Sequence, residues 1–519
     1  MRPSADDRVG SDAVRGNPRP RTVTGIRLGD LAARLAVAPP TTVDAMVTGV
    51  THASGEVHPG DLYAALPGAR RHGAEFVADA AAAGAVAVLT DAAGAELAAG
   101  HGLPTLVVAD PRAVLGTLAS AVYGDPTEKL TVIGVTGTAG KTSTAYLVES
   151  GLRAAGHTTG LIGTVETRLG DLVLDSVRTT PEATDLHAML AAALERGVSA
   201  VVMEVSSHAL AMGRVGGVRF DVGGWTNFGS DHLDFHADAD DYFAAKARLF
   251  DGRCAHEVLN HDDPALKALF KPATISYSAA GDPSATWWAE DVDGEGYAQR
   301  FTLHGPDGLV LDAGVALPGR HNVANALLAV AVLVAAGVDA ATAARGVAAC
   351  GGVPGRLESV GVAGGVRGVV DYAHKTDAVV AVLAALREMS SGRLICVIGA
   401  GGDRDRGKRP AMGAAAAKGA DVVLVTDDNP RTEDPAAIRA EVLAGAYDAG
   451  TRTRIVEVGG RRAAIDEAVR QAEPGDVVAV LGKGHERGQE IAGEVFPFDD
   501  VTELADALRA RFGSLGGQR

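Results

Sequence analysis

The sequence has little cysteine and no long apolar run, and both shortages narrow the class of protein. Its 519 residues include three cysteines, each far from the others and inside an apolar segment: Cys254, Cys350 and Cys396. This spacing supplies neither a disulfide framework nor a zinc cluster, and it is typical of the reducing cytoplasm. Glycine and charged residues interrupt the alanine-rich runs, so no stretch is apolar enough to span a membrane. We therefore expect a cytoplasmic protein without membrane insertion.

The sequence also has fewer positively than negatively charged residues. Lysine and arginine number 48 against 65 aspartate and glutamate residues, which gives a net charge of -17 at pH 7. No basic patch could dominate such a surface, so nucleic acid is not an expected partner. Any phosphate group must be bound locally, by a loop and a few lysines or arginines. Residues 1–23 are polar and lack an apolar segment, so they predict a disordered extension rather than a signal peptide.

What the sequence does contain is a glycine loop between a strand and a helix. The apolar run 130–135 predicts a buried strand, and the spacing of apolar residues in 143–155 predicts a helix. Backbone N–H groups and the helix dipole favour a phosphate in the loop between them. Lys141 would reach the outer phosphates of a nucleotide, and the Thr142 hydroxyl would hold Mg²⁺. The strict pattern G-x-x-x-x-G-K-[ST] needs glycine where Val135 stands, so a chance glycine turn is the competing interpretation.

Strands and helices alternate along the rest of the chain, whose length exceeds what one core supports. We predict an α/β protein of three domains: a small N-terminal α/β domain (24–127), a central domain with a parallel sheet around the phosphate loop (128–353) and a Rossmann-like C-terminal domain (354–519). Strands are predicted at residues 45–50, 61–66, 85–89, 105–109, 130–135, 160–165, 200–205, 222–227, 366–370, 394–398, 422–425, 455–458 and 477–481.

Polar residues follow the strands of the central domain, where parallel sheets bind their ligands. Glu204 ends an apolar strand beside the phosphate loop, which makes it a natural Mg²⁺ ligand. His232 follows the next strand, and Lys246 lies on a predicted helix among apolar neighbours. A lone glutamate could cap a helix and a lone histidine could belong to the core. Their occurrence together, at strand ends that face one loop, favours a functional site.

Further candidates lie toward the C-terminus. Asn322 and Asn325 are one turn apart on a predicted helix, where they could recognise a base edge or cap the helix. In the C-terminal domain four strands end in polar, glycine-rich loops, at residues 371–374, 399–409, 426–431 and 482–486. Four such loops at one edge of a sheet predict a binding face.

These motifs carry a resemblance to a known family. From about residue 45 to residue 505 the chain resembles the Mur ligases, the ATP-dependent amino-acid ligases of peptidoglycan precursor synthesis. It is most similar to the members that add 2,6-diaminopimelate to UDP-N-acetylmuramoyl-L-alanyl-D-glutamate. The shared motifs are Thr136-Gly-Thr-Ala-Gly-Lys-Thr142, Glu204-Val-Ser-Ser-His208, Asp231-His-Leu-Asp234, Ala245-Lys246, Asp428-Asn-Pro-Arg431 and Gly482-Lys-Gly-His-Glu486.

The resemblance implies a role for each matching residue. Catalytic roles fall to Lys141, Glu204, His232 and Lys246. ATP contacts fall to Gly137, Thr138, Ala139, Gly140, Lys141, Thr142 and Ser143 and, near the adenosine, to Asn322, Arg356 and Asp371. Mg²⁺ ligands would be Thr142, Glu204, His232 and a carbamylated Lys246, since a carbamate replaces a repelling ammonium by an anionic oxygen. The muramyl dipeptide would contact Ser54, Thr179, Thr180, Ser206 and Arg214. Diaminopimelate would contact Arg404, Asp428, Asn429, Arg431, Gly482 and Glu486.

The resemblance also implies a reaction. ATP would phosphorylate a carboxylate of the UDP substrate, and the amine of diaminopimelate would attack the acyl phosphate and release phosphate. Lys141 and Mg²⁺ would offset the charge of the converging anions. The C-terminal domain would bring the amino acid, and its closure would exclude water. We expect a monomer.

Diaminopimelate differs from lysine by one distal carboxylate, and Arg431 has the paired donors that such a group requires. Glu486 would receive the ammonium beside it. The competing interpretation is that Arg431 only pairs with Glu433 or Asp434 on the surface.

The chain departs from the usual family pattern in three loops, which read Ala53-Ser-Gly55, Asn227-Phe-Gly-Ser-Asp-His232 and Ala373-His-Lys-Thr-Asp377. Three alternatives therefore stay open. The first is a lysine-adding ligase or a paralogue acting on a modified precursor. The second is a ligase like the folylpolyglutamate synthetases. Those enzymes lack a uridine-binding first domain, so residues 24–126 argue against this alternative. The third is a catalytically silent nucleotide-binding partner, which would not need Glu204, His232 and Lys246.

Overall fold

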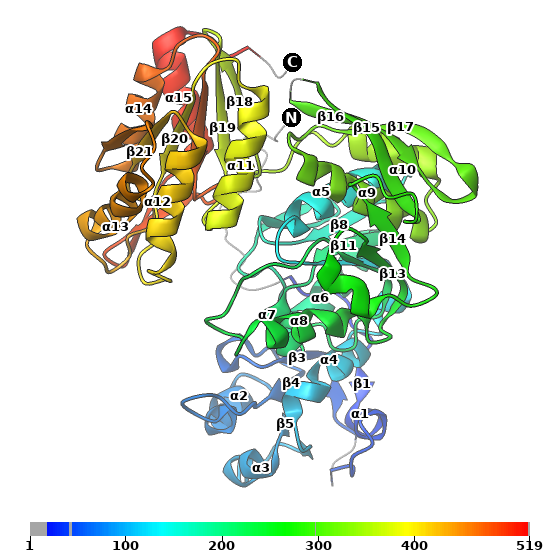
Figure 1. The fold of residues 1–519 in the computed structure, drawn as a ribbon. Coiled ribbons are helices and arrows are strands. Elements are labelled where there is room, and N and C mark those ends of the chain that lie inside the picture. Colours follow the sequence, from blue (N-terminus) through cyan, green and yellow to red (C-terminus); the bar gives the residue numbers. More distant parts are fainter. Residues whose placement is uncertain (1–17, 41–43, 296, 517–519) are drawn as a thin grey trace. The chain divides into compact units, whose positions relative to one another are not determined.

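The computed structural model describes residues 18–40, 44–295 and 297–516. By its internal contacts the chain divides into two compact units. The first unit holds the residues up to 288, with 305–307 and 327–347, and the second holds 289–304, 308–326 and 348–519. Each unit is built from β-sheet and helices (Figure 1). Within the described part of the chain, no helix combines the length and the apolar character needed to cross a membrane.

The N-terminal part of the first unit is a small parallel sheet with the strand order β3-β4-β5-β6. Leu62, Leu89 and Leu106 on its strands pack with Leu115 and Leu118 of helix α4 in one core. The elements are β1 (Ile26–Arg27), α1 (Leu28–Arg34), β2 (Met46–Val47), β3 (Gly49–Thr51), β4 (Asp61–Ala64), α2 (Val77–Ala82), β5 (Ala87–Thr90), α3 (Ala92–Ala98), β6 (Thr105–Val107) and α4 (Pro111–Val122).

The central sheet of the first unit has the strand order β10-β9-β8-β11-β7-β12-β13-β14. Its middle strands, from β8 to β14, are parallel, and β9 and β10 form an antiparallel extension. The elements are β7 (Thr131–Thr136), α5 (Lys141–Ala154), β8 (Thr159–Ile162), β9 (Glu166–Leu169), β10 (Leu172–Asp175), α6 (Ala183–Glu195), β11 (Ala200–Glu204), α7 (Ser207–Ala211), β12 (Phe220–Trp225), α8 (Ala239–Ala247), β13 (Cys254–Asn260) and β14 (Ile275–Ser278). The sheet is therefore mixed, because antiparallel strands flank the predicted parallel core.

Several elements lie at or beyond the boundary between the units. β16 and β17 form an antiparallel hairpin in the second unit. The elements are β15 (Trp287–Glu295), β16 (Ala298–His304), β17 (Val310–Val315), α9 (Arg320–Ala335) and α10 (Ala340–Ala348).

The C-terminal sheet has the strand order β18-β19-β23-β20-β21-β22, and all its pairs except β18 with β19 are parallel. Alternate residues of β20 face opposite cores: Cys396 and Ile398 pack with α11, α12 and α13, and Ile395 and Val397 pack with α14 and α15. Figure 1 shows this sheet between the two helix layers. The elements are β18 (Glu358–Ala363), β19 (Val366–Asp371), α11 (Thr376–Met389), β20 (Leu394–Ile398), α12 (Lys408–Gly419), β21 (Val422–Val425), α13 (Pro435–Asp448), β22 (Arg454–Glu457), α14 (Arg461–Gln471), β23 (Val477–Leu481), β24 (Gly488–Ile491), β25 (Glu494–Pro497) and α15 (Asp500–Phe512).

The predicted α/β fold class with three sheet-containing domains is confirmed, while the exact domain limits remain predictions. Residues 1–17 of the predicted disordered extension lie outside the described residues. In the described remainder, Arg19 pairs with Asp61 at 2.7 Å, and the backbone N–H groups of Arg21 and Thr22 donate to Glu195.

Candidate active site

The phosphate loop joins β7 to α5, and the residues after β12 fix its shape. Gly137 has φ +139°, and a Cβ there would meet Thr226 Oγ1 at 1.8 Å, so only glycine fits. Asn227 Oδ1 accepts a hydrogen bond from Ala139 N at 3.0 Å, and its Nδ2 donates to Ala139 O at 3.1 Å. Helix α5 begins at Lys141, so the backbone N–H groups of its first turn are available to an anion at this loop.

Two lysine side chains meet at one carbonyl oxygen of this loop. Lys141 Nζ donates to Gly137 O at 2.7 Å and to Thr138 O at 3.0 Å. Lys246 Nζ, from α8, donates to the same Gly137 O at 2.8 Å and lies 4.6 Å from the ring centre of Tyr242. Lys246 is only 1% exposed, so water screens this pair of like charges weakly. The structure thus places close together two lysines that the sequence analysis identified separately.

Glu204 ends β11 as a buried carboxylate, 1% exposed, beside the first turn of α5. Its Oε2 accepts hydrogen bonds from Thr142 Oγ1 at 3.1 Å and from Thr164 Oγ1 at 3.1 Å. Its Oε1 accepts from Thr164 N at 2.7 Å. These donors are two hydroxyls and a backbone N–H. Thr164 was missed from the sequence because a single threonine after a short strand carries no signal.

The oxygen atoms of Thr142 and Glu204 fit a magnesium ion. Mg²⁺ prefers oxygen ligands and is usually held by one or two carboxylates together with substrate phosphates. The described residues contain no group of three or more histidine, cysteine, aspartate or glutamate side chains that could hold a metal by themselves. A buried carboxylate and a hydroxyl at a phosphate loop therefore match the donor set of a nucleotide-bound Mg²⁺ better than that of a permanent protein metal site.

His232 lies in a group of aromatic rings after β12. Its ring centre is 4.7 Å from that of His208 and 6.0 Å from that of Tyr242, and its Nε2 lies 3.2 Å from Asp231 Oδ2. Burial lowers the pKa of His208, with the neighbouring His236 acting in the same direction. Tyr242 thus contacts the ring of His232 and the ammonium of Lys246, which brings two predicted catalytic residues to one part of the molecule.

The residues predicted to hold the muramyl dipeptide lie around the end of β11. Thr180 Oγ1 donates to Glu204 O at 2.8 Å and accepts from Ser206 N at 3.1 Å. Thr179 Oγ1 lies 3.0 Å from Thr164 Oγ1, a partner of Glu204. Arg214 Nη1 lies 3.4 Å from Thr180 O. The structure therefore brings Thr179, Thr180, Ser206 and Arg214 together beside Glu204.

Ser54 lies in a short helical turn, residues 54–56, in the N-terminal part of the first unit. It lines a hollow of about 400 Å³ together with Tyr63, Arg71, Phe76 and Arg112, among others. Arg112 Nη1 lies 3.6 Å from a carboxylate oxygen of Glu182, which also pairs with Arg214 at 2.9 Å. The hollow is thus linked through one carboxylate to the residues beside Glu204.

The three residues predicted on the adenosine side lie in the second unit. Asp371 ends β19, accepts hydrogen bonds from Leu357 N at 2.6 Å and Ala373 N at 2.7 Å, and has its pKa raised by burial while Arg356 opposes the shift. The Arg356 guanidinium lies 4.5 Å from the ring centre of Tyr372. Asn322 is buried and donates from Nδ2 to Pro318 O at 2.8 Å. The side chain donates this bond to a carbonyl that precedes α9, whereas an N-cap accepts from a backbone N–H, so the bond tests neither the capping nor the base-contact interpretation of Asn322.

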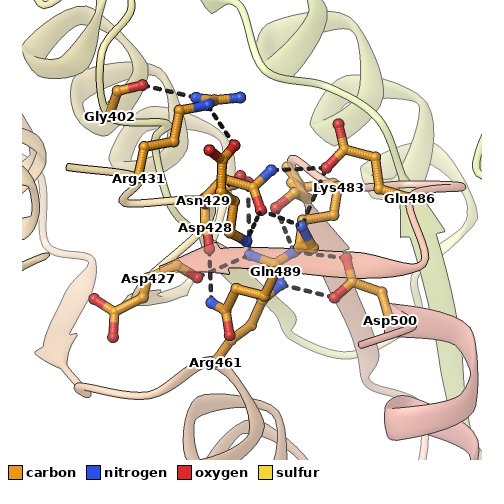
Figure 2. A network of polar contacts seen from close by, with 12 residues as sticks. Gly402, Asp427, Asp428, Asn429, Arg431, Arg461, Lys483, Glu486, Gln489 and Asp500 are labelled. Carbon is orange, nitrogen blue, oxygen red and sulfur yellow. Dashed lines mark hydrogen bonds and ion pairs between the residues drawn. The ribbon is translucent and has the colours of Figure 1, made fainter. Parts of the chain in front are cut away.

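The loops after β21 and β23 form one polar network (Figure 2). Asn429 Nδ2 donates to Glu486 Oε2 at 2.8 Å, and Asn429 N donates to Asp428 Oδ1 at 2.7 Å. Gly482 has φ +117°, and a Cβ there would meet Asp428 Oδ2 at 2.5 Å, so the loop requires glycine. Three of the six residues predicted to contact the amino acid are therefore joined by hydrogen bonds, and Gly482 lies beside Asp428.

Arg431 belongs to the same network through the β24–β25 hairpin. Its Nε donates to Glu490 Oε2 at 3.0 Å and its Nη1 donates to Gly402 O at 2.7 Å. In the competing interpretation Arg431 pairs with Glu433 or Asp434 on the surface. Glu433 instead pairs with Arg406 and Arg409, and Arg431 pairs with Glu490. Arg404 lies exposed on the loop after β20, the loop that contains Gly402. Its predicted contact with the amino acid stays a prediction.

Three charged residues and one amide of the network were missed from the sequence. Lys483 donates to Asn429 and Glu486, and Gln489 Nε2 donates to Asp428 O at 2.6 Å. Arg461 and Asp500 form a fully buried ion pair at 2.6 Å, and Arg461 Nη2 also donates to Leu481 O at 2.9 Å. Lys483 stands inside a recognised motif and could have been noticed. Arg461 and Asp500 are 39 positions apart and carry no local signal.

Comparison with known proteins gives matches along most of the folded chain. Residues 46–123 match the Mur ligase family, catalytic domain; residues 135–333 match the Mur ligase middle domain; and residues 355–484 match the Mur ligase, glutamate ligase domain. UDP-N-acetylmuramoyl-L-alanyl-D-glutamate--2,6-diaminopimelate ligase of Streptomyces avermitilis is 53% identical over 96% of this chain and 99% of its own length. The ligase of the same name from Streptomyces coelicolor is 54% identical, with the same coverage.

A solved structure of a UDP-N-acetylmuramoyl-L-alanyl-D-glutamate--2,6-diaminopimelate ligase is also similar. It is 31% identical, has a TM-score of 0.68, and the match covers 94% of this chain and 99% of that one. Three Mur ligase domain models match successive parts of the chain, and relatives of high identity match it over nearly their whole length. The chain belongs to the Mur ligase family.

Proposed function

We propose that the chain is an ATP-dependent ligase that adds 2,6-diaminopimelate to the D-glutamate of UDP-N-acetylmuramoyl-L-alanyl-D-glutamate in peptidoglycan precursor synthesis. The observation that carries this proposal is the C-terminal network. It presents the Arg431 guanidinium and the Glu486 carboxylate on either side of Asn429 (Figure 2). A cation and an anion are complementary in charge to an amino-acid end group, which bears one carboxylate and one ammonium. The names of the similar ligases agree with this substrate.

The residues of the first unit suit the activation half of the reaction. A carboxylate must gain a leaving group, so one of its oxygens attacks the terminal phosphorus of ATP, and ADP departs. Lys141 would hold the phosphates through the loop, while Thr180, Ser206 and Arg214 would hold the dipeptide beside Glu204. Thr142 and Glu204 would hold Mg²⁺, which supplies charge neutralisation for the phosphate oxygens when bound. Donors fixed in a buried site stabilise developing charge without reorganising.

The second half forms the amide. The amine nitrogen of diaminopimelate attacks the acyl carbon, a tetrahedral intermediate forms, and the carbon–phosphate oxygen bond breaks as phosphate leaves with its electron pair. The attacking amine loses a proton, which the departing phosphate or solvent accepts. We propose that Lys246 acts as a carbamate, because its two oxygens would meet the nearby Lys141 ammonium with opposite charge where two ammonium groups would repel.

The test is a substrate panel with the purified wild-type chain, read as ADP release. We expect release to require both the UDP-dipeptide and diaminopimelate. We expect diaminopimelate to exceed L-lysine in kcat/KM by a factor of about 10³ or more, because lysine lacks the distal carboxylate that Arg431 would bind with the donors not engaged by Glu490 and Gly402. Arg431→Ala should lose most of this preference. The exposed Arg470→Ala, which removes an arginine paired with Glu467 on α14, is the matched control and should keep it.

Equal use of L-lysine by the wild-type chain would refute the diaminopimelate assignment and favour a lysine-adding ligase. ADP release that does not depend on the UDP-dipeptide would refute the ligase assignment itself. An unchanged ratio in Arg431→Ala would leave the activity standing and remove Arg431 from the amino-acid site.

A further inference from the structure

Lys483 is a lysine without access to solvent at the centre of the C-terminal network. It follows β23, its side chain is 0% exposed, and its Nζ donates to Asn429 Oδ1 at 2.9 Å and to Glu486 Oε2 at 3.1 Å. Figure 2 shows its ammonium beneath these two side chains. A buried ammonium is costly unless it is paired, so this position needs a reason beyond packing. Both of its described partners are residues proposed to contact the amino acid.

The bonds from Lys483 determine how its partners are oriented. Asn429 Oδ1 accepts from Lys483 and also from Glu490 N at 3.0 Å, so the amide oxygen faces inward. The amide nitrogen is thereby turned toward Glu486, to which it donates at 2.8 Å. Without the lysine, the amide oxygen would keep only the hydrogen bond from Glu490 N, so the preference for this amide orientation would be weaker.

The same bonds select one oxygen of Glu486. Both the Lys483 ammonium and the Asn429 amide bond to Oε2. This leaves Oε1 as the oxygen that can accept from a ligand, and the Glu486 side chain is 33% exposed while Lys483 is fully buried. The lysine is therefore placed to act on a ligand only through Glu486 and Asn429.

We propose that Lys483 is a positioning residue for the amino-acid substrate: it fixes the rotamer of Glu486 and the amide orientation of Asn429, and so sets the affinity for the ammonium end of diaminopimelate. The inference rests on the proposed function and deepens it. It assigns Lys483 to binding of the third substrate and to neither ATP nor the UDP-dipeptide. The alternative is a purely structural lysine, whose loss would disturb the domain as a whole.

The experiment compares Lys483→Met with wild type in steady-state kinetics, with each of the three substrates varied in turn. We expect the KM for diaminopimelate to rise about 10- to 100-fold, in the range of a lost hydrogen bond to a charged group. KM for ATP and for the UDP-dipeptide should stay within about twofold, since their proposed residues do not contact Lys483. Lys418→Met, an exposed lysine on α12, is the control and should match wild type.

A double-mutant cycle separates positioning from structure. If Lys483 acts through Glu486, then Lys483→Met should add less than about threefold to the KM for diaminopimelate in a Glu486→Gln background, because coupled residues are not additive. A structural role predicts the full effect in both backgrounds, together with a lower melting temperature. Lys483→Gln, which keeps a donor for Asn429, provides a second variant and should show a smaller rise than Lys483→Met.

The outcomes are distinct from those for the proposed function. A wild-type chain that does not use diaminopimelate refutes the function and this inference with it. An active wild type with an unchanged KM in Lys483→Met, or an additive cycle, refutes only the positioning role. Failure of both Lys483 variants to fold also refutes it, because the lysine is then required for the fold itself.

Discussion

At the scale of single residues, the pair Lys141 and Lys246 has the clearest chemical meaning. Both ammonium groups donate to Gly137 O, and Lys246 is buried. A carbamate on Lys246 would remove one of two like charges from a poorly screened place and supply an anionic oxygen near the ring of Tyr242, which His232 also contacts. Such a modification would thus have a reason in the electrostatics of the site, independent of any metal.

We therefore expect Lys246→Ala to lose activity by a factor on the order of 10²–10³ or more, as for other fixed charge-stabilising groups. Short carboxylic acids added to this variant should restore part of the activity by supplying the missing oxygens. Lys418→Ala should need no such rescue. Intact-mass measurement of the active wild-type chain, kept native near neutral pH because carbamates lose carbon dioxide in acid, should show the added carbon dioxide. A plain amine in fully active protein under those conditions would contradict the proposal.

His187 makes a second prediction at this scale. It is fully buried, its Nε2 bonds to Gly216 O at 2.9 Å, and burial lowers its pKa from 6.5 to about 4. The folded chain therefore resists protonation that the unfolded chain accepts below pH 6.5. Neutral His187 therefore contributes its full stabilisation above pH 6.5. As the pH falls from 6.5 toward 4, the free energy of unfolding should decrease by roughly 1–3 kcal/mol.

Urea unfolding between pH 4 and 7 tests this. The wild type should lose stability over this interval more steeply than His187→Gln, which has no group to titrate there. His374 and His485 have pKa values lowered to about 4 by burial as well, so part of the slope should persist in the variant. Parallel curves for the two proteins would mean that His187 titrates alike in the folded and unfolded states.

At the scale of elements, helix α4 packs unusually closely on the turn at residues 213–217. A Cβ on Gly116 would lie 2.2 Å from Gly216 O, against backbone that cannot swing away. Helix propensity alone predicts that Gly116→Ala stabilises α4 by up to about 1 kcal/mol. Overpacking predicts the opposite sign, a loss of about 1–3 kcal/mol.

We expect overpacking to win, so Gly116→Ala should lower the unfolding free energy despite its better helix propensity. Ala113→Val, on the exposed face of the same helix, should change it by less than about 1 kcal/mol. Denaturant titration of both variants gives the sign. A higher unfolding free energy for Gly116→Ala would show that the turn at residues 213–217 can shift to accommodate the methyl group at little energetic cost.

The helices and strands also show how much of the fold could be predicted from the sequence. The apolar run 130–135 and the loop after it predicted β7 and α5 closely, because hydrophobic period and glycine placement are local signals. The predicted strand 45–50 is two strands, β2 and β3, that pair in different sheets. The local pattern holds no information about pairing partners, so this split could not be foreseen.

The residues of the candidate site likewise divide into those that the sequence could identify and those that it could not. Glu204, Lys141 and Arg431 stand in recognisable motifs at strand ends, and the structure gives each of them polar partners there. The supporting bonds depend on contacts between distant segments, such as that of Arg461 with Asp500. Only folding reveals such pairs, since neither residue differs locally from an ordinary charged helix residue.

At the scale of the whole molecule, the two compact units hold different sets of predicted ligand residues. The first unit contains Ser54, Thr180 and Arg214, and the second contains Asn429 and Glu486. A ligand stabilises the part of a protein that binds it, by roughly 2.7 kcal/mol at about 100 times its Kd. Large chains with separate cores commonly unfold in more than one step.

Scanning calorimetry should therefore resolve two transitions. The UDP-dipeptide should raise the melting temperature of one, and diaminopimelate should raise that of the other, with glycine as an amino acid that raises neither. Arg431→Ala should abolish the shift by diaminopimelate and leave the other intact. A single transition that responds to both ligands would show that the units unfold together.

The side chains of Asn429, Lys483 and Glu486 hold one another through bonds inside the chain. Their rotamers are therefore fixed by internal partners, and receiving an amino acid there should cost the protein little conformational entropy. Association should be dominated by enthalpy, with the remaining entropic cost carried by the flexible carbon chain of diaminopimelate. For the design of inhibitors, stiffening that chain in its bound shape is the step that should improve affinity most.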